Sequence, residues 1–570
     1  MTSVIHPSLP SGSHAPTRKM SCFAKVICSS RHLVRGKARA QASRLSRFCS
    51  SSIMSEDPKI GKFLDYMEKL KNYERTGVPT GAGTDSDDGF DLGRMRRLLQ
   101  QLGNPHTHFQ AVHIAGTKGK GSTAAFLSNI LRKEGYSVGC YTSPHLLTIR
   151  ERLSFGRDGD PVSAEALMNH FHQVKGILDK SIELEDGALT HFEVFTALAF
   201  SLFSQEKVDV AVIEAGLGGT RDATNVLSSS ELTASVITSI GEEHLAALGG
   251  SLESIAVAKS GVIKHGRPVV LGGPFDLHIE LIIREKASLM NSPVVSACDP
   301  GIQSIVKHFG REDGKAYQTC DILINVQEDL ELFIDLTNIK LQMLGNHQLQ
   351  NAVTATCTAL CLRSQGWGIS DESIRAGLER TWLLGRSRFL QDKEAEVLGV
   401  SGTSILVDGA HTEASAKALS DTLKRIHPDG MLAFVVAMAN DKDHVAFARQ
   451  LLSGRKPDIV LLTEVNFAGG RSRATPALTL KDSWVRCALD MGLDILDLGT
   501  ISKEKAAGHS PRSTAKKTIV LAICEDASVH EAVKVADSLL QSTDRNKSGL
   551  LVATGSLHVA SSLLAYAAQC

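Results

Sequence analysis

The chain has 570 residues, enough for more than one hydrophobic core, and its hydrophobic residues (42%) are mainly aliphatic, with aromatics at 5%, which favours an α/β protein. Beyond residue 55, 53 Lys and Arg face 62 Asp and Glu, a net charge of about −9, and no uncharged apolar run reaches the roughly 18 residues of a membrane span. We therefore expect no nucleic-acid partner and no membrane-spanning segment.

Residues 1–53 differ in composition from the rest of the chain. The first 55 residues carry nine Lys or Arg, between Arg18 and Arg47, and many Ser, but no acidic residue before Glu56. This composition, without the apolar core of a secretory signal, is typical of a transit peptide, and the Arg spacing favours mitochondrial import. We therefore expect a disordered transit peptide over 1–53 and a soluble protein of the mitochondrial matrix. A plastid or cytosolic location, or a merely disordered basic tail, is the alternative.

The predicted elements begin with an amphipathic helix over 57–80 and a second helix near Asp91. Residues 111–115 predict a short buried strand, and a Gly-rich turn separates it from a helix over 122–134. The same alternation recurs downstream, which indicates a parallel sheet. The predicted elements there are helix 192–204, strands 208–214 and 234–240, helix 251–264 and strand 268–273.

A second α/β series follows a less regular stretch around 298–340 and a helix near 347–365. The predicted strands of this series are 404–410, 432–439, 458–465, 518–525 and 549–556. We therefore predict two domains, one over 54–384 and one over 385–570.

The segment IAGTKGKGST joins the strand at 111–115 to the helix at 122–134 and contains a P-loop. Gly119 and Gly121 allow backbone amides to face a polyphosphate. Lys120 adds a positive charge, and Ser122 offers a hydroxyl group to Mg²⁺. No base-reading NKxD segment has the right spacing, which argues against a switch GTPase. The fold class is thus α/β, with a P-loop ATPase-like parallel-sheet domain and a second, smaller Rossmann-like α/β domain.

Three further residues are candidates for the same site. Glu214 ends strand 208–214, and a carboxylate at the carboxyl end of a parallel strand faces the ligand crevice, where it can hold Mg²⁺. His244 follows strand 234–240, and Lys259 lies 15 residues further along. Taken singly, each could be a surface or structural side chain. Their joint position favours a shared role.

A series of short motifs runs along residues 57–570 in a fixed order. They are GTKGKGS, TSPHL with RER, HFEVFTALAF, EAGLGGTRDATN, EEH with AKSGVI, GNHQLQNA, LLGRSR, DGAH and GSLH. In sequence and order this series resembles the folylpolyglutamate synthase and dihydrofolate synthase family, a branch of the Mur-type ligases, and within it the organellar dihydrofolate synthases of eukaryotes.

The resemblance implies an ATP-dependent ligase that uses Mg²⁺, with K⁺ as a further candidate ion. The implied catalytic residues are Lys120, Glu214, His244 and Lys259. The implied metal-binding residues are Ser122, Glu214, His244 and Lys259, the last as a carbamate. The implied ATP-binding residues are Lys118, Gly119, Lys120, Gly121, Ser122, Asn351, Arg386, Asp408 and His411.

The resemblance also implies a pterin- or folate-binding set. Its members are Asp91, Gly93, Arg94, Thr190, His191, Phe192, Glu193, Arg221, Asp222 and Ala223. Residues 190–193 could instead form only a helix N-cap. Two departures from the family, DGAHTE for the common DGAHNP and EEHL for the common DHT, leave the positioning of ATP around Thr412 open.

The implied reaction joins L-glutamate to a carboxylate that ATP has converted to an acyl phosphate. That carboxylate belongs either to dihydropteroate or to the glutamate of a folate. EAGLGGTRDATN is closer to dihydrofolate synthases, so dihydropteroate is favoured, and a folylpolyglutamate synthase or a bifunctional enzyme is the alternative. We expect a monomer. A nucleotide-binding regulatory protein and a peptidoglycan Mur ligase are less favoured, because the candidate site is complete and only a short helical lead-in precedes the P-loop.

Overall fold

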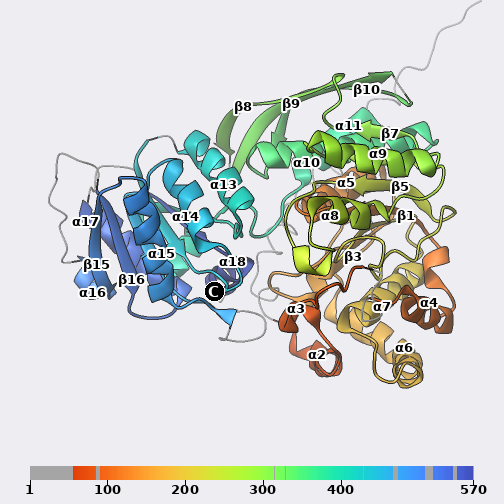
Figure 1. Cartoon of the computed structure of the whole chain (residues 1–570), viewed down its shortest axis with the longest axis horizontal. Coiled ribbons are helices and arrows are strands. Elements are labelled where there is room, and N and C mark those ends of the chain that lie inside the picture. Colours follow the sequence, from red (N-terminus) through yellow and green to blue (C-terminus); the bar gives the residue numbers. More distant parts are fainter. Residues whose placement is uncertain are drawn as a thin grey trace, which may run out of the picture. The chain divides into compact units, whose positions relative to one another are not determined.

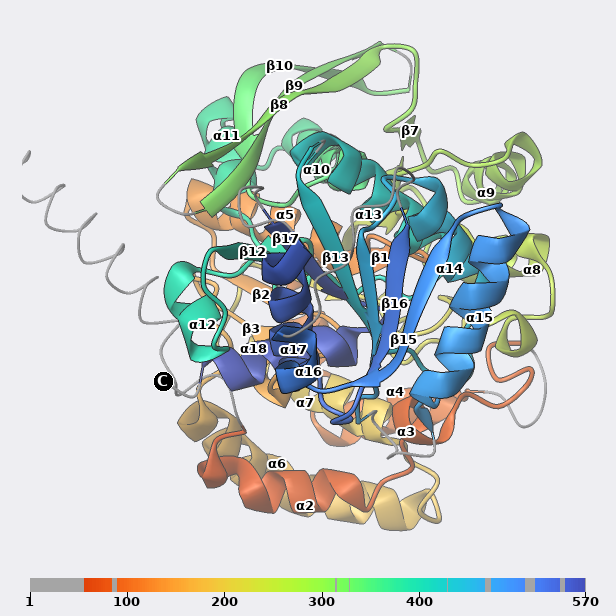
Figure 2. The same cartoon turned by 90° about the vertical axis from the view of Figure 1, so that its left-hand side faces the viewer.

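The computed structural model of the chain describes most of the sequence. The described residues are 56–84, 90–312, 315–327, 329–427, 429–466, 473–507, 518–543 and 549–568. The predicted transit peptide over 1–53 lies outside them. Figures 1 and 2 show the arrangement of the helices and strands in two views.

The P-loop belongs to a mostly parallel sheet, which has seven strands among the described residues in the order β3-β2-β4-β1-β5-β6-β7. Only β3 runs antiparallel to its neighbour in this part of the structure. The strands are β1 (Gln110–Ala115), β2 (Val138–Tyr141), β3 (Leu153–Ser154), β4 (Val210–Glu214), β5 (Leu232–Ile237), β6 (Val269–Leu271) and β7 (Val294–Ser296). Because β1 lies between β4 and β5, the P-loop and the carboxyl ends of both neighbours meet at one edge.

Helices cover both faces of this sheet, which explains its almost fully buried, aliphatic strands. On one face lie α5 (Lys120–Glu134), α10 (Asn346–Ser364) and α11 (Asp371–Arg380). On the other face lie α4 (Leu92–Gln101), α6 (Ala164–Leu184) and α7 (His191–Gln205). Near β6 lie α8 (Leu252–Ser260) and α9 (Leu277–Leu289). Short 3₁₀ turns are η2 (Pro105–Thr107), η3 (Ile149–Arg152) and η4 (Leu245–Ala247).

The stretch over 298–340, expected to be irregular, is instead a three-stranded antiparallel sheet in the described residues. Its strands are β8 (Ile302–Glu312), β9 (Lys315–Gln327) and β10 (Glu331–Leu341). Only one face of this sheet packs on the core around α10 and α11, so apolar residues alternate with polar ones, as in β10. The expectation of irregular structure was therefore wrong.

The prediction of one continuous helix over 57–80 is also wrong. The chain forms η1 (Pro58–Ile60), α2 (Gly61–Glu68) and α3 (Tyr73–Thr76). Asn72 starts α3 by accepting a hydrogen bond from the amide of Glu74 at 3.0 Å, and Gly77, with φ +84°, ends it. These two local signals interrupt the apolar periodicity.

The C-terminal lobe, defined here as β11–β17 with helices α12–α18, is a second doubly covered sheet. Its strand order within the described residues is β11-β12-β17-β13-β14-β16-β15. The strands are β11 (Arg388–Phe389), β12 (Thr403–Val407), β13 (Met431–Val436), β14 (Ile459–Leu462), β15 (Ile495–Ile501), β16 (Ile519–Cys524) and β17 (Gly549–Thr554). Together with the first sheet, this confirms the predicted α/β fold class, a P-loop-bearing parallel-sheet domain with a second α/β domain.

Figure 2 shows the helices of the C-terminal lobe on both sides of its sheet. On one face lie α13 (Glu413–Ile426), α14 (His444–Ser453) and α15 (Ala477–Asp490). On the other face lie α17 (Val529–Thr543) and α18 (Leu557–Ala567). Two short helices complete the lobe, α12 (Asp392–Val397) and α16 (Lys503–Ala507).

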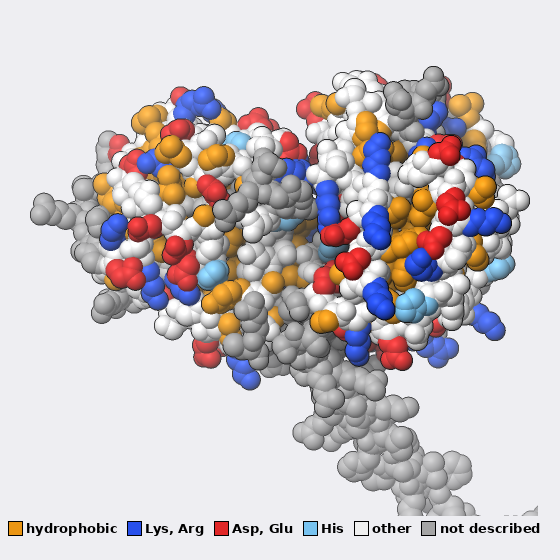
Figure 3. Space-filling view, turned by 90° about the horizontal axis from the view of Figure 1, so that it is seen from below, with side chains coloured by type: hydrophobic (Ala, Val, Ile, Leu, Met, Phe, Trp, Pro, Cys, Tyr) orange, Lys and Arg blue, Asp and Glu red, His pale blue; other side chains and the backbone are white. Residues whose placement is uncertain are grey.

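The surface carries charges of both signs. On the face shown in Figure 3, Lys and Arg side chains are interspersed with Asp and Glu side chains. In the part of the chain that the structure describes, no helix has both the length and the apolar character needed to cross a membrane.

Candidate active site

The P-loop follows β1 directly and ends in α5. Gly116 has φ +148° and Gly119 has φ +86°, backbone conformations that favour glycine. A Cβ atom on Gly116 would lie 2.0 Å from Oγ1 of Thr238, so no larger residue fits there. Gly119 precedes α5, whose free N-terminal amides begin at Lys120. The loop therefore presents a helix N-terminus, which favours the binding of phosphate groups.

Two lysines converge on one carbonyl group of this loop. Nζ of Lys120 donates to the carbonyl oxygen of Gly116 at 3.1 Å, and Nζ of the buried Lys259 donates to the same oxygen at 2.9 Å. Nζ of Lys120 also lies 3.8 Å from Oε1 of Glu214. Three of the predicted catalytic side chains are thus gathered beside the phosphate-binding loop.

Glu214 is the last residue of β4, at the carboxyl end of the strand as predicted, and its side chain is buried. Its Oε2 accepts a hydrogen bond from the amide of Ser143 at 3.1 Å. Burial raises the pKa of the Glu214 carboxyl group, and the charge of Lys120 acts in the opposite direction. A Cβ atom on Gly121 would lie 3.3 Å from Oε2, so the glycine leaves room beside the carboxylate. Ser122, one residue further, is also buried.

In both His244 and Lys259 the pKa is shifted toward the neutral form. Burial and, to a smaller extent, the nearby charge of Lys120 lower the pKa of Lys259 to about 7. Burial also lowers the pKa of His244, whereas Glu243 opposes that shift. His244 has φ +55°, a strained conformation for a residue with a Cβ atom. Neutral nitrogen atoms of this kind can bind a metal ion or react with an electrophile.

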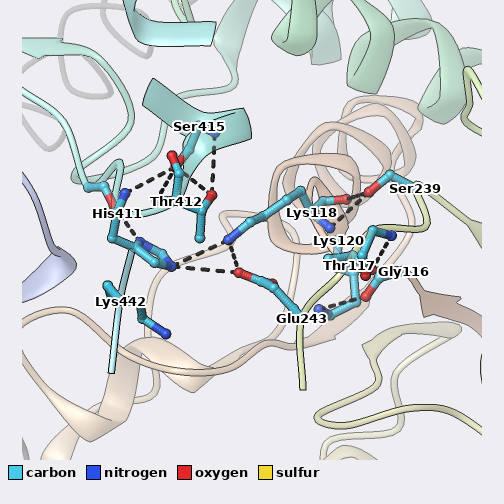
Figure 4. Close-up of polar contacts among 12 residues, drawn as sticks. Gly116, Thr117, Lys118, Lys120, Ser239, Glu243, His411, Thr412, Ser415 and Lys442 are labelled. Carbon is cyan, nitrogen blue, oxygen red and sulfur yellow. Dashed lines mark hydrogen bonds and ion pairs between the residues drawn. The ribbon is translucent and has the colours of Figure 1, made fainter. Parts of the chain in front are cut away.

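Lys118, Glu243 and His411 form a polar cluster that includes one residue of the C-terminal lobe (Figure 4). Nζ of Lys118 forms an ion pair with Oε1 of Glu243 and lies 3.3 Å from Nε2 of His411. Burial lowers the pKa of His411 to about 4. The neutral ring therefore donates from Nδ1 to the carbonyl of Gly409 at 2.8 Å and accepts at Nε2 from Lys118.

Glu243 was absent from the predicted site, although it lies in the EEH motif next to His244. Its position in the sequence could have indicated it, because Glu243 follows β5, and the carboxyl end of β5 lies beside the P-loop. The same segment fastens the loop: the amide of Thr117 donates to the carbonyl of Ser239 at 2.7 Å, and the amide of Lys118 donates to Oγ of Ser239 at 2.9 Å (Figure 4).

Asn351, on α10, lies directly against the P-loop. A Cβ atom on Gly119 would lie 2.3 Å from Oδ1 of Asn351, so only a glycine allows this approach. Nδ2 of Asn351 donates to Oε1 of Gln348 at 3.0 Å, which fixes the orientation of the amide. The structure thus brings this predicted ATP-binding residue to the loop from more than 200 positions away in the sequence.

Arg386 lies in a strained segment just before β11. Gly385 has φ +66° and Ser387 has φ +45°, and the latter is unusual for a residue with a Cβ atom. Asp408 holds this conformation, because its Oδ2 accepts from the amide and from Oγ of Ser387, both at 2.8 Å. Asp408 therefore positions the segment that carries Arg386.

Arg386 also acts on the P-loop through its charge. Burial lowers the pKa of Lys118, and the positive charge of Arg386 lowers it as well.

The predicted substrate residues at 91–94 and 190–193 meet each other in the structure. Asp91 caps α4 and accepts from the amides of Gly93 at 2.7 Å and Arg94 at 3.1 Å. Nε of Arg94 donates to Oε1 of Glu193 at 3.3 Å. Thr190 and Glu193 form a capping box at the start of α7. The helix N-cap considered as the alternative is therefore present, and binding of a pterin by these residues stays a prediction.

Arg221, Asp222 and Ala223 lie in the loop after β4. Asp222 is buried and accepts from Oγ1 of Thr224 at 2.5 Å. Burial raises the pKa of Asp222. Arg221 donates from Nη1 to the backbone carbonyl of Phe90 at 3.2 Å, which links this loop to the residues before α4. Ala223 is buried.

His191 and Phe192 begin α7 beside that loop. A Cβ atom on Gly216 would lie 2.5 Å from Cζ of Phe192, so the ring packs directly on the backbone after β4. His191 is buried and stacks on Phe195 with a ring separation of 6.2 Å. Burial lowers the pKa of His191 to about 4, so the ring is neutral at physiological pH.

A further polar cluster, around Arg152, was not predicted. The buried Arg152 donates to both carboxylate oxygens of Glu74, at 2.9 and 2.6 Å, and from Nε to Nδ1 of His145 at 2.9 Å. Burial lowers the pKa of His145 to about 3, so it accepts this bond as a neutral ring. Arg473 of the C-terminal lobe donates to the carbonyl of Glu74 at 3.0 Å. The motifs TSPHL and RER contain His145 and Arg152, but their partners could not be inferred.

Two family models match this chain. Residues 114–359, from β1 to α10, match the family described as the Mur ligase middle domain. Residues 393–469 match the family described as dihydrofolate synthetase, C-terminal domain. The P-loop, the buried strand-end carboxylate and the second α/β lobe, taken with these matches, define an ATP-dependent ligase of the Mur type.

Individual relatives identify the family within this class of ligases. The chain is 33% identical over 362 residues to the dihydrofolate synthase/folylpolyglutamate synthase of Bacillus subtilis, with 63% of this chain and 78% of that protein covered. It is 32% identical to a probable dihydrofolate synthetase of Schizosaccharomyces pombe, with 73% of this chain and 93% of that protein covered. The crystal structure of a folylpolyglutamate synthase from Thermotoga maritima superposes with a TM-score of 0.64 at 26% identity, covering 88% of this chain and 94% of that one. The chain belongs to the dihydrofolate synthase and folylpolyglutamate synthase family.

Proposed function

We propose that this protein joins L-glutamate to dihydropteroate, forming dihydrofolate at the expense of ATP. The observation that carries the proposal is the match of residues 393–469 to a dihydrofolate synthetase C-terminal domain. A second candidate, addition of glutamate to tetrahydrofolate by the same site, is favoured by the Bacillus subtilis relative, whose name covers both activities.

The proposed reaction has two steps. The carboxylate of the pteroate attacks the γ-phosphorus of ATP, which forms an acyl phosphate and releases ADP. The amino group of glutamate then attacks the acyl carbon, so that the amide bond forms and phosphate and a proton leave. No side chain becomes covalently attached, so the protein acts by positioning and by electrostatic stabilisation. Lys120 and the amides at the start of α5 are placed to bind the phosphoryl oxygens.

The side chains predicted to bind a metal ion have a chemistry that suits magnesium. Mg²⁺ commonly takes one or two protein carboxylates and completes its shell with phosphate oxygens and water. Glu214 offers a buried carboxylate, Ser122 a hydroxyl group and His244 a neutral ring, and Gly121 leaves space beside the carboxylate. Within the described residues no group of three or more His, Cys, Asp or Glu side chains could hold a metal ion alone. When bound, Mg²⁺ would neutralise charge on the phosphates.

We further propose that Lys259 is carbamylated. Carbamate formation requires a neutral amine, and the pKa of Lys259, lowered to about 7, makes that form available near neutral pH. The fraction of carbamate should therefore rise as the pH rises through about 7. Mass spectrometry under native conditions, with bicarbonate at about pH 6 and about pH 8, would measure the CO₂ adduct. The adduct should disappear in Lys259→Arg, and an adduct that persists in this variant would place the modification elsewhere.

The substrate is tested by offering two acceptors separately. Purified protein with ATP, Mg²⁺ and glutamate should form an amide with dihydropteroate and release one ADP for each amide. Turnover with tetrahydrofolate alone would contradict the proposal and favour the second candidate, whereas turnover with both would indicate a bifunctional enzyme. The mitochondrial matrix remains our predicted location, which a reporter fused to residues 1–53 would check, and a monomer remains our predicted assembly.

A further inference from the structure

The loop between β2 and η3, residues 142–148, contacts both Glu214 and the segment that carries Arg386. The amide of Ser143 donates to Oε2 of Glu214 at 3.1 Å. Leu146 and Leu147 pack against the core of the C-terminal lobe. A Cβ atom on Gly385 would lie 3.3 Å from Leu146, so the loop also borders the strained segment that carries Arg386. The conformation of this loop therefore bears on both Glu214 and Arg386.

Two carboxylates hold the far end of the loop. Glu151 accepts from the amides of Leu146, Leu147 and Thr148, each at 2.9 Å. The next amide, that of Ile149, donates instead to Oε1 of Glu56 at 2.7 Å. Hydrogen bonds from backbone amides to a carboxylate are charge-assisted and stronger than bonds between neutral groups.

Glu56 makes a second bond to the same turn. Oγ1 of Thr148 donates to Oε2 of Glu56 at 2.8 Å, so both carboxylate oxygens are used. Thr148 is fully buried and Ile149 almost so, which means that neither donor could easily turn to water if Glu56 were absent. Burial raises the pKa of Glu151, and the charge of Glu56 adds to that shift, as expected for carboxylates that share one turn.

Glu56 precedes the P-loop by about 60 residues in the sequence. It belongs to the lead-in before η1, and it is the first residue that the structure describes. Its neighbour Asp57 has an unrelated role, because the bond that its side chain accepts within the described residues is a local one, from the amide of Lys59 at 2.9 Å. Of these two adjacent carboxylates, Glu56 binds the turn at Thr148 and Ile149, whereas Asp57 caps η1.

We propose that Glu56 is a positioning residue for the ligase reaction: its carboxylate fixes the turn at Thr148 and Ile149, and through it the loop that contacts Glu214 and borders Arg386. Glu56 touches no reacting group in this scheme. Its loss should free the loop and disturb the alignment of the two sides of the site, while leaving the sheets and their cores intact.

The test compares Glu56→Ala with the matched control Asp57→Asn in the full-length chain. Glu56→Ala removes both hydrogen bonds that the carboxylate accepts from the turn. With the acceptor on which the wild-type protein is active, this variant is expected to lower kcat/KM about tenfold. Hydrogen exchange of the amides at 146–149 should become faster in this variant, and exchange in β1 and β4 should stay at the wild-type rate. Asp57→Asn should match the wild type in every readout.

Thr148→Val supplies a second variant that keeps the carboxylate but removes the donor Oγ1, which also accepts a bond from the amide of Arg150 at 3.4 Å. It should reproduce part of the loss in kcat/KM, and the double variant should lose less than the sum of the two single losses, because both substitutions remove the bond between Oγ1 of Thr148 and Glu56. The proposal is overturned if Glu56→Ala resembles Asp57→Asn in both kinetics and hydrogen exchange, or if the two substitutions act additively. Because hydrogen exchange needs no substrate, its outcome does not depend on which acceptor the enzyme uses.

Discussion

Replacing Lys120 by alanine is expected to reduce turnover about 1,000-fold while leaving the protein folded. Nζ of Lys120 contacts only the Gly116 carbonyl and the carboxylate of Glu214 in the contacts described above, so no apolar core depends on it. The variant removes a positive charge from the place where the phosphoryl oxygens would accumulate negative charge. Release of ADP at saturating substrate measures the effect.

A lysine on the same helix provides the control. Lys133 lies in the last turn of α5 and is exposed, so Lys133→Ala should retain wild-type turnover. Thermal unfolding of both variants would show whether the fold is retained. A Lys120→Ala enzyme within tenfold of the wild type would mean that the P-loop lysine has no part in phosphoryl transfer.

Replacing Glu214 by glutamine is expected to lower turnover about 100-fold and to raise the concentration of Mg²⁺ needed for half-maximal rate. Glutamine keeps the shape of the side chain and can still accept from the amide of Ser143, so packing at the end of β4 should be unchanged. What it loses is the buried negative charge beside Lys120. Steady-state rates over a Mg²⁺ titration measure both effects.

Glu206→Gln is the matched control for this change. Glu206 follows α7, shortly before the same strand, and is exposed, so both its turnover and its Mg²⁺ dependence should equal those of the wild type. If Glu214→Gln also behaved like the wild type in the Mg²⁺ titration, the cation would have to bind elsewhere.

The elements around the P-loop could be predicted closely from the sequence. A strand was expected over 111–115 and a helix over 122–134, and the structure has β1 over Gln110–Ala115 and α5 over Lys120–Glu134. The helix begins two residues early because Gly119 adopts a left-handed φ and ends the loop there. The apolar run of a strand buried on both faces is a strong signal. The strands β8–β10 lacked it because only one of their faces is buried.

The candidate site could be predicted where a rule of topology applies. Glu214 follows a parallel strand, and the carboxyl ends of neighbouring strands meet, so its place beside the P-loop follows from the pattern. The same rule could have found Glu243, which follows β5 and pairs with Lys118 of the P-loop. Arg152 could not be assigned in this way, because its partner Glu74 lies far along the chain and no local pattern records such a contact.

The bonds that Thr148 and Ile149 donate to Glu56 also bear on the predicted removal of a leader over residues 1–53. A protease that removed the predicted leader after residue 53 would leave this carboxylate in place. A cut only a few residues later would delete it and yield a folded but poorly aligned enzyme. If Glu56 has the proposed role, the position of the new N-terminus would determine the specific activity of the processed protein.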